Sequence, residues 1–197
     1  MITKKDLLEC AKSNFTKFGS KRITLDELAK TLGISKKTIY VHFKNKETLV
    51  NKSVASLIND YKLDINDIVK NNTNDDILTI ILIYKRGFEY LRYFKPSFIF
   101  GLKKYYPKAY TTFNDFRKEL AFSTVLNLLK NAKEKGLILP NVNLKLVIEL
   151  YFYKVESIAF TEDNLFTLYD TDIILKHLIV YNLKGITTKN YANPYYN

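Results

Sequence analysis

Apolar residues recur along this chain with the three-to-four-residue spacing of helices, and no stretch alternates with the two-residue period of a strand. Helix-breaking residues are scarce, with 6 Gly and 4 Pro among 197 residues. The first stripe predicts a helix over residues 4–18, with Gly19 as a left-handed residue just past its end. Its members are Leu7, Leu8, Ala11, Phe15 and Phe18. The pattern predicts an all-α fold.

Two short helices joined by a glycine turn are predicted next. Thr24 and Glu27 have the spacing of a capping box, which places a helix start there, and an apolar stripe of about two turns follows. Gly33 supplies the positive φ that a tight turn requires. Ser35 then caps a helix over residues 36–43. Ile39 and Phe43 are expected to face inward from that helix.

Longer helices account for the rest of the chain. A fourth helix is expected from about Lys46 to Asp60 or beyond, ending before the polar stretch at residues 71–74. Five further stripes bring the total to about nine helices, and they cover residues 75–94, 97–104, 109–135, 144–160 and 172–185, with a loop over 161–164. The tail at residues 190–197 has no apolar period, so it is expected to fray. We predict a domain boundary inside the fourth helix, which gives domains 1–60 and 61–197.

The charge balance is strongly basic, with 31 Lys plus Arg against 20 Asp plus Glu. Residues 1–60 hold 12 of these basic and 6 of these acidic residues, so the excess is denser at the amino-terminal end. A positive surface suits a phosphate backbone or an acidic membrane, and a lysine-rich surface can also be simply solvated. Charge alone does not choose among these.

The lone Cys10 cannot form an intrachain disulfide, and it excludes zinc sites built from two or more cysteines. No signal-peptide pattern opens the chain, and its apolar runs are far shorter than the ~20 residues of a membrane span. We therefore expect a soluble, cytoplasmic protein without metal or cofactor and without a membrane partner.

A two-turn helix, a glycine turn and a second short helix form the layout of a helix-turn-helix DNA reader, here over residues 24–43. The second helix of such a unit is apolar behind and polar in front, because its front must meet base edges in the major groove. Five residues fit that front: Lys36, Lys37, Thr38, Tyr40 and Val41.

The stretch from Thr24 to Leu49 closely resembles the amino-terminal domain of the tetracycline-repressor (TetR) family. It fits the combined pattern T-x-x-x-[IL]-A-x-x-[LA]-G-[IV]-S-x-x-T-[IL]-Y-x-H-F-x-x-K-E, which is far more specific than a generic helix-turn-helix. The resemblance covers roughly the first 60 residues, and the rest of the chain matches in helical layout only. It implies a three-helix DNA-binding domain followed by a helical ligand-binding and dimerisation domain.

Carried over residue by residue, the resemblance implies these DNA-binding positions: Thr24, Ser35, Lys36, Lys37, Thr38, Tyr40, Val41, His42 and Lys46. Thr24 and Lys46 would touch phosphate, and the residues between them base edges and backbone. Lys37 stands where many relatives have Gly, and it reaches either a guanine edge or a phosphate. Val41 either touches a thymine methyl group or is a stray exposed apolar residue.

The resemblance also implies a twofold homodimer and a cavity for a small-molecule effector. Dimer contacts are expected on the last two helices, at Val147, Tyr151, Ile174, His177, Leu178 and Tyr181. Ligand contacts are expected from Phe88, Tyr105, Phe116, Glu119, Phe122 and Phe152, although most aromatic rings at helical spacing simply form core.

The sequence thus predicts a sequence-specific transcriptional regulator that binds a near-palindromic operator of double-stranded DNA as a dimer. Repression released by an unknown effector is the first interpretation, and ligand-independent or activating regulation is the alternative. An enzyme is not expected, since His42 and His177 are the only histidines and neither lies near a nucleophile motif or a phosphate loop. A basic scaffold or membrane-peripheral protein fits less well, because the predicted recognition front mixes Thr and Tyr with Lys.

Overall fold

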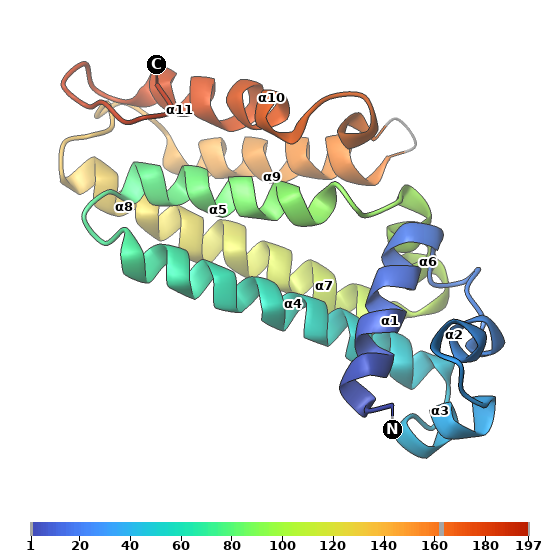
Figure 1. Cartoon of the computed structure of the whole chain (residues 1–197). Coiled ribbons are helices and arrows are strands. Elements are labelled where there is room, and N and C mark those ends of the chain that lie inside the picture. The colour runs from blue at the N-terminus through green and yellow to red at the C-terminus, as the bar shows by residue number, and fades with distance from the viewer. Residues whose placement is uncertain (1, 162–163, 197) are drawn as a thin grey trace. The chain divides into compact units, whose positions relative to one another are not determined.

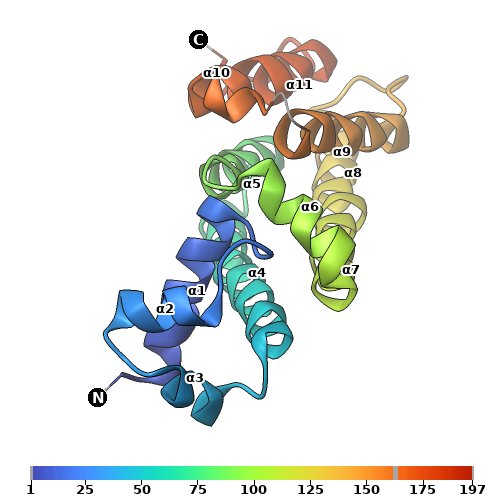
Figure 2. The same ribbon diagram turned by 90° about the vertical axis from the view of Figure 1, so that its right-hand side faces the viewer.

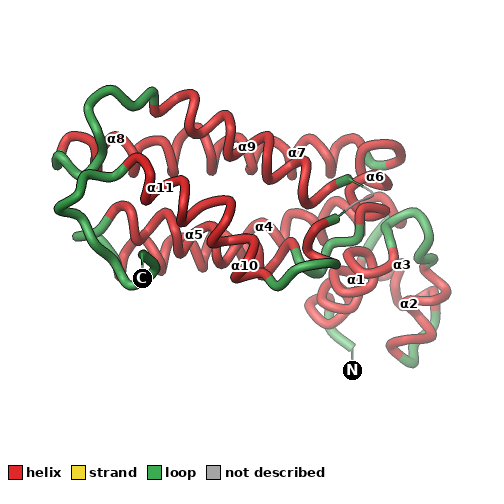
Figure 3. Tube along the Cα trace, turned by 90° about the horizontal axis from the view of Figure 1, so that it is seen from above, coloured by secondary structure: helices red, strands yellow, loops and turns green. Residues whose placement is uncertain are grey.

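The computed structural model describes residues 2–161 and 164–196, and it is helical throughout, as the tube in Figure 3 shows. The α-helices are α1 Lys4–Phe18, α2 Leu25–Leu32, α3 Lys36–His42, α4 Lys46–Asn71, α5 Asp76–Leu91, α6 Pro96–Tyr105, α7 Pro107–Glu119, α8 Leu126–Glu134, α9 Leu144–Phe160, α10 Thr171–Leu175 and α11 Tyr181–Ile186. In the described part of the chain, β pairing is limited to one isolated bridge, between Ile138 and Thr187. The all-α fold class is confirmed.

Two π-helical stretches each join two separately numbered helices into one continuous rod. Leu120–Val125 joins α7 to α8, and Lys176–Val180 joins α10 to α11. Counted as rods, the described helices number nine, as the apolar stripes predicted. One short 3-10 helix, Leu165–Thr167, follows the predicted 161–164 loop, of which residues 162–163 lie outside the described residues.

The chain divides into two compact units. The first contains residues 1–61 and 93–116, and the second contains residues 62–92 and 117–197. The first unit is therefore larger than the predicted domain 1–60, because α6 and most of α7 belong to it. Two close backbone approaches explain why α6 belongs there: Gly19 packs against Ser97, and Gly101 packs against Ser20.

The first unit is built around the apolar faces of α1, α2, α3 and the start of α4 (Figure 1). Leu7, Leu28, Ile39 and Leu49 are each 1% exposed or less. Lys12 is buried as well, and its ammonium pairs with Asp60 of α4 and Glu9 of α1. This pairing lets a charged residue stay in a buried position.

The second unit packs α5 against α8 and against the α10–α11 rod, with α9 alongside (Figures 1 and 2). Its core is aliphatic and aromatic, and Ile77, Ile80, Leu129 and Ile148 are fully buried. None of the described helices is long and apolar enough to cross a membrane.

Two local expectations were wrong. Gly19 has a positive φ of 91°, but its ψ of 135° lies outside the left-handed helical region, so it does not form the predicted left-handed cap. The tail does not fray over its described residues: Tyr191 donates a hydrogen bond to Asp75 at 2.6 Å, and the Lys184 ammonium donates to the Tyr196 carbonyl at 2.6 Å. Hydrogen bonds from these polar side chains hold the tail on the second unit. The spacing of apolar residues does not predict such bonds.

Candidate nucleic-acid interface

The α2–α3 pair is fixed by its helix ends. The Thr24 hydroxyl accepts from the Glu27 amide at 3.1 Å, and the Glu27 carboxylate accepts from the Thr24 amide at 2.6 Å, which completes the predicted capping box. Gly33 ends α2 at φ 65° and ψ 31°, the left-handed conformation that favours glycine. These short-range contacts set the turn between the two helices.

Helix α3 has a buried back and an open front. Ile39 and Phe43 are 0% and 3% exposed, as predicted, whereas Tyr40 and Val41 are 48% and 75% exposed. A three-quarters exposed valine and a half-exposed tyrosine on adjacent positions give the front a mixed apolar and polar character. Such a surface can meet both base edges and methyl groups.

The start of α3 is held by its cap. The Ser35 hydroxyl accepts from the Thr38 amide at 3.2 Å and lies 2.9 Å from the Thr38 hydroxyl. Both hydroxyls are therefore partly engaged within the helix, and Thr38 is half-buried. Their remaining hydrogen-bonding capacity faces the same end of the helix as Lys36 and Lys37.

The two lysines of α3 differ in their surroundings. Lys36 donates to the Asp26 carboxylate of α2 at 2.8 Å, and this bond raises the pKa of Lys36. Lys37, by contrast, is exposed and enters no ion pair among the described residues. Lys37 is thus the cation on this front that is available without first breaking a pair.

Lys46 lies at the start of α4 and is half-buried. Burial lowers the pKa of Lys46, and the neighbouring Lys21 ammonium lowers it further. The Lys46 ammonium donates to the Lys21 carbonyl at 3.1 Å and lies 5.9 Å from the centre of the Tyr106 ring. A cation held at a helix start, where the helix dipole disfavours it, is positioned for an anion.

The structure brings the nine predicted DNA-binding residues onto one unit, all from the segment 24–46. Thr24 is exposed, and His42 is half-buried at the end of α3. Sequence reasoning missed two neighbours of Lys46, namely Lys21 and Tyr106. Lysine–tyrosine contacts between distant segments leave no periodic signal in the sequence.

Comparison with known proteins gives the same assignment. Residues 7–52 match the family model described as bacterial regulatory proteins, tetR family. The HTH-type transcriptional regulator YvaF of Bacillus subtilis is 28% identical over 173 residues, which cover 86% of this chain and 88% of YvaF. The chain carries a TetR-family DNA-binding domain over residues 7–52.

Two further relatives agree with this assignment. IcaR of Staphylococcus aureus, the negative transcriptional regulator of the biofilm operon icaADBC, is 28% identical over 118 residues, covering 60% of this chain and 57% of IcaR. The solved structure of FadR from Bacillus subtilis, in complex with stearoyl-CoA, has a TM-score of 0.72 at 16% identity and covers 93% of this chain and all of FadR. Nearly the whole chain therefore shares the fold of this solved structure, beyond the residues that the sequence pattern matched.

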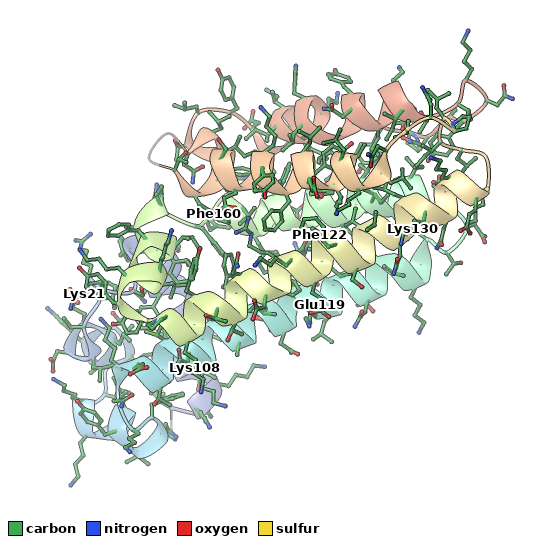
Figure 4. The ribbon with its side chains drawn as sticks, turned by 180° about the vertical axis from the view of Figure 1, so that it is seen from behind. Lys21, Lys108, Glu119, Phe122, Lys130 and Phe160 are labelled. Carbon is green, nitrogen blue, oxygen red and sulfur yellow. The ribbon has the colours of Figure 1, made fainter. Side chains whose placement is uncertain are left out.

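The predicted ligand residues fall on both compact units. Tyr105 and Phe116 belong to the first unit, where Tyr105 stacks under Lys21 and Phe116 packs edge-on against Tyr61. In the second unit, the Phe122 and Phe152 rings lie 5.4 Å apart. Phe88, 1% exposed, packs against Tyr84 and Phe166, and Glu119 is exposed and pairs with Lys62. Figure 4 labels Glu119 and Phe122.

The predicted dimer residues differ in exposure. His177 and Tyr181 are exposed and stack edge-on, and Val147 and Leu178 are half-buried. Tyr151 and Ile174 are 4% and 7% exposed, so these two side chains already belong to the core of one chain. Large exposed apolar side chains on the same helices are Leu146, Leu150, Tyr153, Ile173 and Tyr181.

Proposed function

We propose that this chain is a transcriptional repressor that binds a near-palindromic operator as a homodimer and is released by a small-molecule effector. The observation that carries the proposal is the open front of α3, where Lys37, Tyr40 and Val41 are exposed over a buried apolar back. The relative IcaR is a negative transcriptional regulator, which supports repression as the mode of action. The protein would act by binding, without catalysis, in the cytoplasm where the chromosome lies.

In this proposal, phosphates are held at two helix starts, those of α2 and α4. The start of α2 at Thr24 would hold one phosphate, because the helix dipole favours an anion there, and Lys46 would hold a second phosphate from the start of α4. These contacts set the register of α3 but carry no base sequence. Ser35, Thr38 and His42 would add contacts at the two ends of α3.

Base reading would come from the middle of α3. A lysine reaches guanine O6 and N7 in the major groove, and valine packs on a thymine methyl group. Lys37 and Val41 are the exposed side chains with those chemistries, and Tyr40 lies between them in sequence. Lys36 would contribute only after leaving Asp26.

A dimer is required because a single recognition helix makes too few contacts for specific binding. The proposed dimer face follows one stripe of α9, at Leu146, Leu150 and Tyr153, and extends over Ile173 and Tyr181 of the neighbouring α10–α11 rod. All five side chains are 46% to 66% exposed in the single chain. A second copy would cover this apolar face.

The effector would bind the second unit. Phe122 and Phe152 offer paired aromatic rings there, and the structural relative FadR was solved with stearoyl-CoA. An effector releases DNA only if it binds more tightly to the arrangement that cannot bind DNA. Helix α4 has residues in both units, so it would carry the change between them.

Selection of bound duplexes from a random pool tests the proposal. The wild-type protein is expected to enrich a sequence with two related halves. Lys37→Ala or Tyr40→Ala should change the preferred base at particular positions, whereas the control Lys52→Ala, an exposed lysine on α4, should leave the sequence unchanged. A wild-type pool without enrichment would contradict the proposed function.

A further inference from the structure

Two segments of the first unit carry cations without any acidic residue. Between Glu9 and Asp26 the chain has four Lys or Arg residues, and between Glu89 and Asp115 it has five. The first segment includes the α1–α2 loop, and the second includes α6 and the start of α7. The proposed function uses neither group of cations.

The structure brings these two segments together. Lys21 lies 4.7 Å from the centre of the Tyr105 ring, and Lys104 lies 5.5 Å from the same ring. Lys104 also lies 5.7 Å from the ring of Phe100, and Arg22 lies 5.7 Å from that of Phe18. Aromatic rings therefore alternate with cations across the junction of the loop with α6.

We define the α6 cationic surface by six exposed residues: Lys17, Lys21, Arg22, Lys103, Lys104 and Lys108. None of the six forms an ion pair with a carboxylate among the described residues. Other cations of the chain do have such partners, as in the pairs Lys12–Asp60, Lys62–Glu119 and Lys135–Asp76. Several unneutralised like charges on one surface repel one another, and an anionic partner relieves that repulsion.

The α6 cationic surface is continuous with the phosphate contact proposed at the start of α4. Lys46 donates to the carbonyl of Lys21, and the Lys21 ammonium in turn lies over the Tyr105 ring. The Lys104 ammonium lies near the same ring. Tyr106, the next residue, lies beside Lys46 itself. A polyanion that reaches Lys46 thus meets further cations along α6.

We propose that the α6 cationic surface binds phosphates of the operator duplex beyond those that the helix-turn-helix contacts. The proposal rests on the proposed DNA-binding function and adds a second element, α6 with the start of α7, to the interface. The partner is duplex DNA because Lys21 of this surface lies beside Lys46, where a DNA phosphate contact is already proposed. The rings of Phe100 and Tyr105 restrict the lysines above them, which lowers the entropy that a phosphate contact costs.

The test compares two triple variants of the full-length protein. One replaces the three lysines of the surface that lie on α6 and at the start of α7, Lys103→Gln, Lys104→Gln and Lys108→Gln. The matched control removes the same charge from exposed lysines of the second unit, Lys118→Gln, Lys130→Gln and Lys145→Gln. Figure 4 labels one residue of each set, Lys108 and Lys130. Affinity for a selected operator duplex is measured across a range of salt concentrations.

Each phosphate contact contributes about 0.9 to the slope of log affinity against log salt. With three lysines in each of two subunits, the first variant should lower that slope by about 2 to 5, and the control variant should keep the wild-type slope. Equal slopes for the two variants would overturn the inference while leaving the proposed function intact. A wild-type protein that binds no selected duplex would overturn both.

Vesicles of phosphatidylglycerol serve as a second polyanion in the same experiment. In one outcome, the wild type binds these vesicles while the Lys103, Lys104 and Lys108 variant does not, with the salt slope on DNA unchanged. That result would assign the surface to a membrane and overturn the inference. A changed DNA slope without vesicle binding supports it.

Discussion

At the scale of single residues, the recognition front depends on which cations are already paired. Lys36 and Lys37 are adjacent and chemically identical, but Asp26 holds only the first of them. The sequence predicted both as DNA contacts because both fit the polar front of a short helix. It did not indicate the ion pair, since the contact crosses from α3 to α2 and no helical spacing connects those two positions.

The Lys36–Asp26 pair gives a prediction for DNA affinity. Its two side chains are 44% and 68% exposed, so solvent screens the pair and little is lost when it opens. Asp26→Asn should free Lys36 and remove a carboxylate that repels phosphate, which tightens operator binding by about two- to fivefold and steepens its salt dependence. Asp67→Asn, at an exposed aspartate of α4, is the control. Fluorescence anisotropy measures both, and weaker binding by Asp26→Asn would show that this carboxylate contacts DNA itself.

At the scale of elements, helix ends were predictable and helix partners were not. A capping box, a serine cap and a glycine turn fix the ends of α2 and α3 from residues within four positions of each other, and those ends agree with the structure. The place of α6 in the first unit depends on Gly19 and Gly101, which allow close backbone approach to Ser97 and Ser20. A glycine in a helical sequence does not show which distant segment of the chain packs closely against it.

The contact between Gly101 and Ser20 gives a prediction for stability. A Cβ atom at position 101 would lie 2.8 Å from the Ser20 hydroxyl oxygen, which is buried without a hydrogen-bond partner among the described residues. Gly101→Ala should therefore lower the free energy of unfolding by about 1–2 kcal/mol. Adding Ser20→Ala removes the oxygen and should restore most of the loss.

Urea unfolding of the wild type, the two single variants and the double variant measures this coupling. Gly185→Ala is the matched control, because a Cβ atom there meets nothing within 4 Å and lies in a helix, so stability should rise by about 0.5–1 kcal/mol. A double variant no more stable than Gly101→Ala would contradict the proposed contact.

At the scale of the whole molecule, the account requires two copies of the chain. The resemblance predicted the last two helices as the dimer face, and α9 and the α10–α11 rod do carry exposed large apolar side chains. The prediction did not distinguish buried from exposed side chains correctly at each residue, because both faces of α9 are apolar. Tyr151 lies in the core, whereas Leu146, Leu150 and Tyr153 lie outside.

Leu150 gives a prediction for assembly. It is 52% exposed on the proposed dimer face, so Leu150→Glu should yield a folded monomer that binds operator at least tenfold more weakly. Leu63→Glu, at a leucine of α4 that is 57% exposed, should stay dimeric. Analytical ultracentrifugation and circular dichroism separate assembly from folding, and a Leu150→Glu dimer would place the interface elsewhere.

The central claim is that two copies of α3 read adjacent major grooves of one duplex. Hydroxyl-radical footprinting of the wild-type protein on its selected operator tests this most directly. The account predicts two protected half-sites on the same face of the duplex, with centres about 34 Å apart. Protection of a single half-site, or protection that does not depend on sequence, would contradict it.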